Sequence, residues 1–157
     1  MIFLPDVTLI CLTNQKFSEH LLAMEKSCEG ISFGARKIIY DMDCTSISKW
    51  NEKIIKELPQ YVQTSHALLI HADGWVINPN LWKDEWLSLD FIGAPWPLPQ
   101  DDYSYLDEEG GLVRVGNSVS LRSKKLMDLV ATRPMEYHYG NNNEDGQICC
   151  WNRKWRS

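Results

Sequence analysis

The chain has 157 residues, which suits a single domain that buries roughly two thirds of its unfolded surface. Apolar residues make up 44% and charged residues 24%, as in ordinary globular proteins. The formal net charge of -5 argues against a nucleic-acid partner, which requires a basic face, but is compatible with a nucleotide-sized ligand. Seven tryptophans exceed common usage, so we expect deep core packing or stacking surfaces.

Cysteine usage and hydropathy indicate a cytoplasmic protein. The five cysteines have no metal-type spacing, and their odd number suits reduced thiols. No segment approaches the roughly 18 consecutive apolar residues that cross a membrane, and the first twelve residues are typical of a strand. We therefore expect a cytoplasmic location and no transmembrane segment.

The first half of the chain alternates apolar runs with amphipathic stretches. We predict strands at 7–12, 37–40 and 67–70, with helices at 17–28 and from a serine cap, Ser46 or Ser48, to 58. The run at 67–70 is continuously apolar, as in a parallel strand buried on both faces. Strands and helices alternating at this spacing predict a Rossmann-like βαβ sheet with right-handed crossovers.

The second half is less regular, which predicts a mixed, mainly parallel sheet with long functional loops. Short apolar pieces at 81–87, 91–92 and 113–115 alternate with loops, of which 97–111 is acidic and 137–145 is rich in asparagine. A helix after Ser120 is ended by Pro134, and a last helix is expected at 144–151.

The strand at 67–70 is followed by a carboxylate, Asp73, at the edge of the sheet where open α/β proteins bind their ligands. Asp73, helped by His71, could hold Mg²⁺ or Mn²⁺, because Mg²⁺ is usually bound by one or two carboxylates together with substrate phosphates. The alternative is that Asp73 only caps the turn that follows.

Two further segments carry candidate chemistry. Asp145, or Glu144 beside it, is placed to act as a general base, although an acidic pair also suits a helix N-terminus. Residues 115–123 are interpreted as a strand-to-helix turn in which Gly116 permits close backbone approach and Ser120 caps the next helix. Arg122 either binds a phosphate or pairs with a nearby acid.

Several segments together resemble the DUF5672 family, which we regard as GT-A-type glycosyltransferases. The resemblance covers nearly the whole chain. It is carried by Val7-Thr-Leu9, Asp73-Gly-Trp-Val-Ile-Asn-Pro79, Phe91-Ile-Gly-Ala-Pro-Trp96, Val115-Gly-Asn117, Ser120-Leu-Arg-Ser123 and Glu144-Asp145-Gly-Gln-Ile-Cys149.

The resemblance implies one GT-A-like domain over 1–157, either a compact form or part of a longer protein. It implies an inverting, metal-assisted glycosyltransferase that takes a UDP-, GDP- or dTDP-linked sugar to a glycan or other hydroxyl acceptor. Asp73, with His71, would hold Mn²⁺ or Mg²⁺ in place of the usual Asp-X-Asp motif. Asp145 would be the base and Glu144 the acceptor-binding and second catalytic residue. The implied donor contacts are Thr13, Asn14, Asp41 or Asp43, Asp73, Gly116, Asn117 and Arg122, and the further acceptor contacts are Trp96 and His138.

Two other functions are open on the sequence. A non-catalytic nucleotide-sugar or carbohydrate-binding module is suggested by the lone Asp73, and by Ser118 and Val119, which stand where the family has two glycines and an aromatic residue. A dinucleotide-binding domain is disfavoured because no Gly-X-Gly-X-X-Gly follows the first strand.

Overall fold

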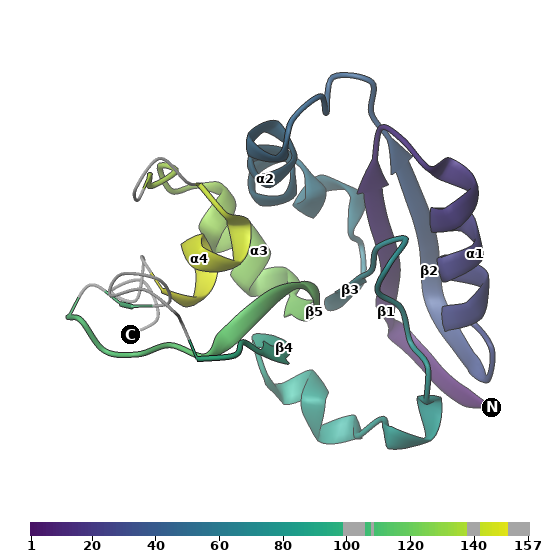
Figure 1. The fold of residues 1–157 in the computed structure, drawn as a ribbon. Coiled ribbons are helices and arrows are strands. Elements are labelled where there is room, and N and C mark those ends of the chain that lie inside the picture. Colours follow the sequence, from purple (N-terminus) through teal and green to yellow (C-terminus); the bar gives the residue numbers. More distant parts are fainter. Residues whose placement is uncertain (99–105, 108, 138–141, 151–157) are drawn as a thin grey trace.

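The computed structural model describes residues 1–98, 106–107, 109–137 and 142–150. Within these residues five strands form one sheet in the order β2-β1-β3-β5-β4 (Figure 1). The strands are β1 (Ile2–Thr13), β2 (Ile31–Tyr40), β3 (His66–Leu69), β4 (Phe91–Pro95) and β5 (Val115–Ser123). The fold is therefore a mixed α/β fold, as the sequence predicts.

The sheet is not mainly parallel, so that part of the prediction is wrong. β1 pairs in parallel with β2 and β3, whereas β5 is antiparallel to both β3 and β4. The reason lies in β5, which is inserted between β3 and β4 and runs against both neighbours. The βαβ pattern of the first half predicts the parallel pairings correctly but carries no information about this later strand.

Helices cover both faces of the sheet. α1 (Phe17–Ser27) packs on β1 and β2 from one side, and α2 (Ile47–Lys56) packs on β1 from the other. α3 (Lys124–Ala131) and α4 (Glu144–Cys149) contact α2 and β5. Three short 3-10 helices complete the described elements: η1 (Leu58–Tyr61), η2 (Pro79–Leu81) and η3 (Asp84–Ser88).

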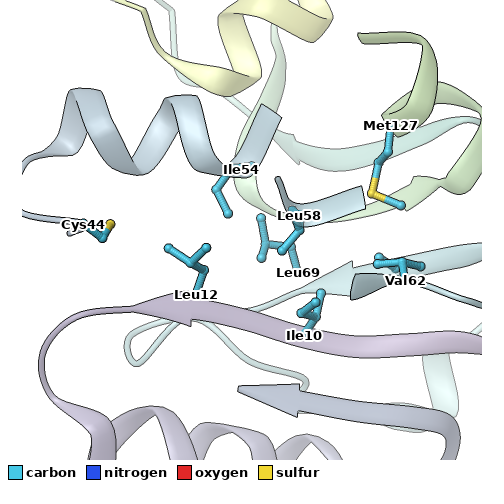
Figure 2. Close-up of a cluster of buried hydrophobic side chains, with 9 residues drawn as sticks. Ile10, Leu12, Cys44, Ile54, Leu58, Val62, Leu69 and Met127 are labelled. Atoms are coloured by element: carbon cyan, nitrogen blue, oxygen red, sulfur yellow. The ribbon is translucent and has the colours of Figure 1, made fainter. Parts of the chain in front are cut away.

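The core forms on both sides of β1 because successive side chains of a strand point to opposite faces. Ile10 and Leu12 pack against Ile54 of α2 in the cluster that Figure 2 shows. Leu9 packs on the other face with Met24 of α1. Each such side chain contributes about 1.5–3 kcal/mol by leaving water. Burial on both faces explains why the central strands are continuously apolar.

The ends of the helices confirm one predicted cap and correct another. The Ser46 hydroxyl accepts a hydrogen bond from the Lys49 backbone N–H at 3.2 Å and so begins α2. Ser120 is not a cap, because it lies inside β5, opposite Gly93 of β4. The cap of α3 is Ser123, which accepts from the Leu126 N–H at 3.0 Å. Residues 115–123 thus form a strand.

Other boundaries differ modestly from the predictions. β1 and β2 are both longer than the apolar runs at 7–12 and 37–40, and α4 ends at 149 instead of 151. The apolar piece at 81–87, for which no element type was predicted, lies largely in the 3-10 helices η2 and η3. Most of the predicted acidic loop, and residues 138–141 of the polar loop, lie outside the described residues. No helix in the described part of the chain is both long and apolar enough to cross a membrane.

Candidate functional site

A cavity of about 910 Å³ opens at the carboxyl ends of β1 and β3. It brings together Thr13 and Asn14, which follow β1, with His71 and Asp73, which follow β3. Four of the predicted site residues therefore meet in one place. Among the described residues, the lining consists of 12–16, 20, 44–47, 50, 71, 73–75, 118 and 119. We call this the polar cavity.

The first wall of the polar cavity is a tight turn between β1 and α1. The Thr13 hydroxyl accepts from the Gln15 backbone N–H at 3.1 Å and lies 2.5 Å from the Gln15 carbonyl oxygen. Lys16, which precedes the first turn of α1, has a left-handed backbone with φ of 51°. A lysine in this region is strained, and such strain often accompanies binding sites. The turn places Lys16 on the cavity lining.

The second wall of the polar cavity is a hairpin-like turn that carries Asp73. The His71 N–H donates to the Gly74 carbonyl at 2.9 Å, and the Gly74 N–H donates back to His71 at 3.2 Å, so Asp73 is at the tip of the turn. The turn lies against β5, because a Cβ atom on Gly74 would be only 2.5 Å from Cγ2 of Val119. Asp73 itself is exposed and faces solvent at the cavity lining.

His71 forms the inner part of the polar cavity. Its ring contacts Trp50 of α2 at a tilt of 47° with a centroid separation of 5.1 Å, and the Trp50 indole N–H donates to the Leu12 carbonyl at 2.9 Å. Nε2 of His71 is buried and has no hydrogen-bond partner among the described residues. Burial lowers the pKa of His71 from 6.5 to about 4, although Asp73 opposes the shift. The imidazole is therefore neutral at pH 7, the state in which it can accept a proton or a metal ion.

The two predicted metal ligands fit a divalent cation only in part. His71 offers a neutral ring with an unpartnered nitrogen, and Asp73 offers an exposed carboxylate on the same lining. The described residues contain no group of three His, Cys, Asp or Glu side chains that could hold a metal ion by themselves. Mg²⁺ typically takes one or two carboxylates plus substrate phosphates, so the pair suits a cation that arrives with a phosphate ligand.

Arg122 lies behind the wall of the polar cavity and is paired with an acid, the second of its two predicted roles. Its Nη2 donates to Oε2 of Glu144 at 2.6 Å, and each side chain is only 1% exposed. Nε donates to the Ser120 hydroxyl at 2.8 Å, and Nη2 lies 3.4 Å from the Ser118 carbonyl oxygen. The guanidinium also stacks 5.6 Å from the Phe91 ring centroid. Arg122 therefore holds the cavity-lining Ser118 segment to α4.

Glu144 is a buried acid with one satisfied oxygen. Oε1 has no hydrogen-bond partner among the described residues, whereas Oε2 accepts from Arg122. Burial raises the pKa of Glu144 above its usual value, and the Arg122 charge opposes the shift. The carboxylate does not reach the polar cavity in this structure, so its predicted acceptor contact stays a prediction.

An amide network fixes the start of α4 against α2. Asn142 is buried; its Oδ1 accepts from the Ser48 hydroxyl at 3.0 Å, and its Nδ2 donates to the Ser48 carbonyl at 3.1 Å. Asn51 donates to the same Asn142 oxygen at 3.4 Å and accepts from the Glu144 N–H at 3.4 Å. Asn142, at the end of the asparagine loop, thus connects the start of α4 to α2 by hydrogen bonds. The sequence did not distinguish this role from that of an ordinary turn.

Asp145, the predicted base, is half-buried in the first turn of α4, and its Oδ1 accepts from the Gly146 N–H at 2.8 Å. It is not part of the polar-cavity lining. Asp41 also lies off that lining: it accepts from Lys53 at 2.5 Å and from the Asp43 N–H at 2.9 Å. The Lys53 hydrogen bond lowers the pKa of Asp41.

Gly116 lies directly against the side chain of Trp96. A Cβ atom on Gly116 would be 2.2 Å from Cζ2 of Trp96, so the indole ring takes the space that the missing side chain leaves. Gly116 therefore allows close approach, but of a side chain of the same protein. The backbone of Asn117 belongs to β5, and His138 lies outside the described residues. The predicted donor contacts of Gly116 and Asn117 and acceptor contacts of Trp96 and His138 stay predictions.

Some lining residues carried no signal that sequence reasoning used. Trp50 was assigned only to a helix, and Lys16 only to a loop, because neither belongs to a recognisable motif. The amino-acid sequence gives no sign that Lys16 adopts a left-handed backbone conformation. Their position follows from the parallel strands, which bring the loops after β1, β2 and β3 to one edge.

Comparison with known proteins supplies a family. The sequence profile of the family described as "Protein of unknown function (DUF5672)" matches residues 39–154, well over half of the chain. No curated protein matches the chain. The chain belongs to the DUF5672 family.

Proposed function

We propose that this member of the DUF5672 family is a glycosyltransferase that moves a sugar from a nucleoside-diphosphate donor to a hydroxyl acceptor, on a GT-A-like fold. The observation that carries the proposal is the polar cavity, where the ends of β1 and β3 bring Thr13, Asn14, His71 and Asp73 together. Its volume of about 910 Å³ lies in the range of pockets that enclose small ligands. It lies at the carboxyl edge, where open α/β sheets bind nucleotides.

The charges around the polar cavity suit a diphosphate. Lys16 lines it as a cation, and Ser46 and Ile47 bring the N-terminus of α2 to the same lining. Helix N-termini carry a partial positive charge that favours phosphate groups. Asp73 is the one carboxylate among the described residues of the lining, so the negative charge of a diphosphate faces little repulsion once Asp73 holds a cation.

His71 and Asp73 would hold Mn²⁺ or Mg²⁺ together with phosphate oxygens of the donor. The bound metal would neutralise the charge that develops on the departing diphosphate. His71 supports this role because its Nε2 is neutral and without a partner among the described residues, and Asp73 supports it because its carboxylate is exposed beside that ring. Trp50 packs against the imidazole, with ring centroids 5.1 Å apart, and so limits its movement.

Asp145 would accept the proton of the acceptor hydroxyl, as inversion requires. The support is indirect. Glu144, its neighbour, is anchored by Arg122, and the same guanidinium contacts the Ser118 carbonyl, which belongs to the cavity wall. The first turn of α4 is therefore held behind that wall, one residue away from the anchored position.

A second function, a binding module that recognises a nucleotide sugar without chemistry, is favoured by one observation. Asp145 is absent from the described lining of the polar cavity, so in this structure the proposed base does not contact the space where a donor would lie. The two functions share ligand and site and differ only in turnover.

A donor-consumption assay separates them. We expect the wild-type protein to release nucleoside diphosphate from one of a panel of UDP-, GDP- and dTDP-sugars with Mn²⁺ present. Asp145→Asn should lower turnover by about 10²–10⁴-fold, the usual contribution of a general base, and leave donor affinity unchanged. Asp128→Asn, at an exposed ion pair on α3, is the matched control. Donor binding without turnover in the wild type would favour the binding module, and full turnover in Asp145→Asn would remove that residue from the mechanism.

A further inference from the structure

A second cavity, of about 300 Å³, lies between the sheet and the segment that carries η2 and η3. We call it the apolar cavity. Its side chains are chiefly hydrophobic, and none of the described residues that line it is charged. Trp82 and Trp86 meet edge to face there with ring centroids 5.3 Å apart, and Leu68 and Leu121 contribute from the sheet. Nothing in the proposed donor site uses these residues.

Three polar side-chain groups at the apolar cavity have partners within the protein. The Ser120 hydroxyl donates to the Ser118 carbonyl at 3.0 Å and accepts from Arg122. Oδ1 of Asn78 accepts from the Asn80 N–H at 3.2 Å. Trp82 donates its indole N–H to Asp84 at 3.1 Å. Because these groups are satisfied within the protein, the cavity favours a ligand that brings apolar surface.

The two cavities share one wall. Val119 of β5 lines both, with Ser118 on the polar cavity and Ser120 on the apolar cavity. Gly74, which follows Asp73, packs directly on the Val119 side chain. A ligand in the apolar cavity therefore lies one β5 residue away from the proposed sugar and metal site.

We propose that the apolar cavity binds the apolar part of a hydroxyl-bearing acceptor, an aromatic or alkyl alcohol, whose hydroxyl points past Val119 toward the polar cavity. The size is consistent with this class: a cavity of about 150 Å³ accommodates benzene, so 300 Å³ has room for about twelve non-hydrogen atoms. The role as acceptor site rests on the proposed function, whereas binding of the alcohol does not.

The probe is 2-naphthol, a hydroxylated ring system of matching size, titrated into the full chain by calorimetry. Leu81→Glu tests the site, because Leu81 lines the cavity yet is 66% exposed, so a carboxylate there leaves the fold intact. Leu22→Glu, on the exposed side of α1 and away from both cavities, is the matched control. We expect saturable binding that Leu81→Glu weakens at least about tenfold and Leu22→Glu leaves unchanged.

A second variant shows whether the loss of binding belongs to the cavity and not to position 81 alone. Ala94→Glu, at an exposed lining residue of β4, should weaken naphthol binding in the same way. Absence of saturable binding, or equal loss in Leu22→Glu, overturns the inference. Sedimentation of the wild type as a dimer that Leu81→Glu dissociates, without naphthol binding, would also overturn it, because a second copy of the chain would then cover the cavity.

A separate kinetic measurement tests whether the apolar cavity is the acceptor site. With a donor present, Leu81→Glu should raise KM for naphthol and leave kcat unchanged, the pattern of lost uniform binding. Naphthol binding in a protein that binds no nucleoside diphosphate would refute the proposed function and leave the apolar site standing. Diphosphate binding without any naphthol binding would refute the apolar site alone.

Discussion

Replacing Glu144 by leucine should destabilise the fold by about 3–5 kcal/mol at pH 7, because the change leaves a buried guanidinium without its carboxylate. Arg122 and Glu144 are each 1% exposed and are joined at 2.6 Å. Arginine cannot shed its proton, so the charge persists in the variant. For a chain of this length the melting temperature should fall by about 6–20 °C.

The reciprocal change behaves differently with pH. Arg122→Met leaves Glu144 buried, but a carboxyl group can take up a proton, and burial already raises its pKa. A raised pKa in the folded state contributes stability at low pH that is lost as the pH rises through the folded pKa. The deficit of Arg122→Met relative to wild type should therefore shrink between pH 8 and pH 5. The deficit of Glu144→Leu should not shrink in that direction, because its unpaired guanidinium keeps its charge and no carboxyl group is left there to take up a proton.

Urea unfolding of the three proteins at pH 5 and pH 8, followed by circular dichroism, measures both effects. Ser118 and Ser120 lose the same Arg122 contacts at both pH values, so they add a constant to that variant. A loss below about 1 kcal/mol in Glu144→Leu, or identical pH dependence in the two variants, would refute the reasoning.

Three further perturbations test other parts of the structure. In metal-free protein, wild type should gain stability over His71→Gln as the pH rises from about 4 to 6.5, because the folded pKa is depressed; parallel unfolding midpoints across that range would contradict this. Gly116→Ala should cost about 1–3 kcal/mol and alter the near-ultraviolet dichroism, since its Cβ displaces the Trp96 ring; an unchanged spectrum would count against it. Asp41→Asn should cost less than about 1 kcal/mol by removing the partner of Lys53, with the cost vanishing as the pH falls through the lowered pKa of Asp41, as chemical unfolding will show.

Local patterns were sufficient for the first half of the fold and for part of the site. The continuous apolar run of β3 indicated burial on both faces, and parallel strands present their carboxyl ends at one edge. That rule was applied to Asp73, whereas Thr13 and Asn14 were implied by the family resemblance; in the structure these three residues and His71 line the polar cavity together. Their role in donor binding stays a prediction.

Long-range pairing was beyond local patterns. The segment at 115–123 has the glycine and serines of a turn, yet β5 forms because it fits between β3 and β4, a condition that no short window contains. The same holds for the ion pair of Arg122 and Glu144, which joins positions 22 residues apart. Either residue alone could contact a ligand. Only the packed fold shows that the two charges pair with each other.

Calorimetry of nucleoside-diphosphate binding, with and without Mn²⁺, tests the central claim most directly. The account predicts that UDP, GDP or dTDP binds the wild-type chain in the presence of Mn²⁺, and that Asp73→Asn loses the metal dependence together with most of the affinity. Asp84→Asn, at an exposed carboxylate outside the polar cavity, should bind as wild type does. Failure of all three nucleotides to bind, or an affinity that ignores both Mn²⁺ and Asp73, would contradict a metal-assisted donor site in the polar cavity.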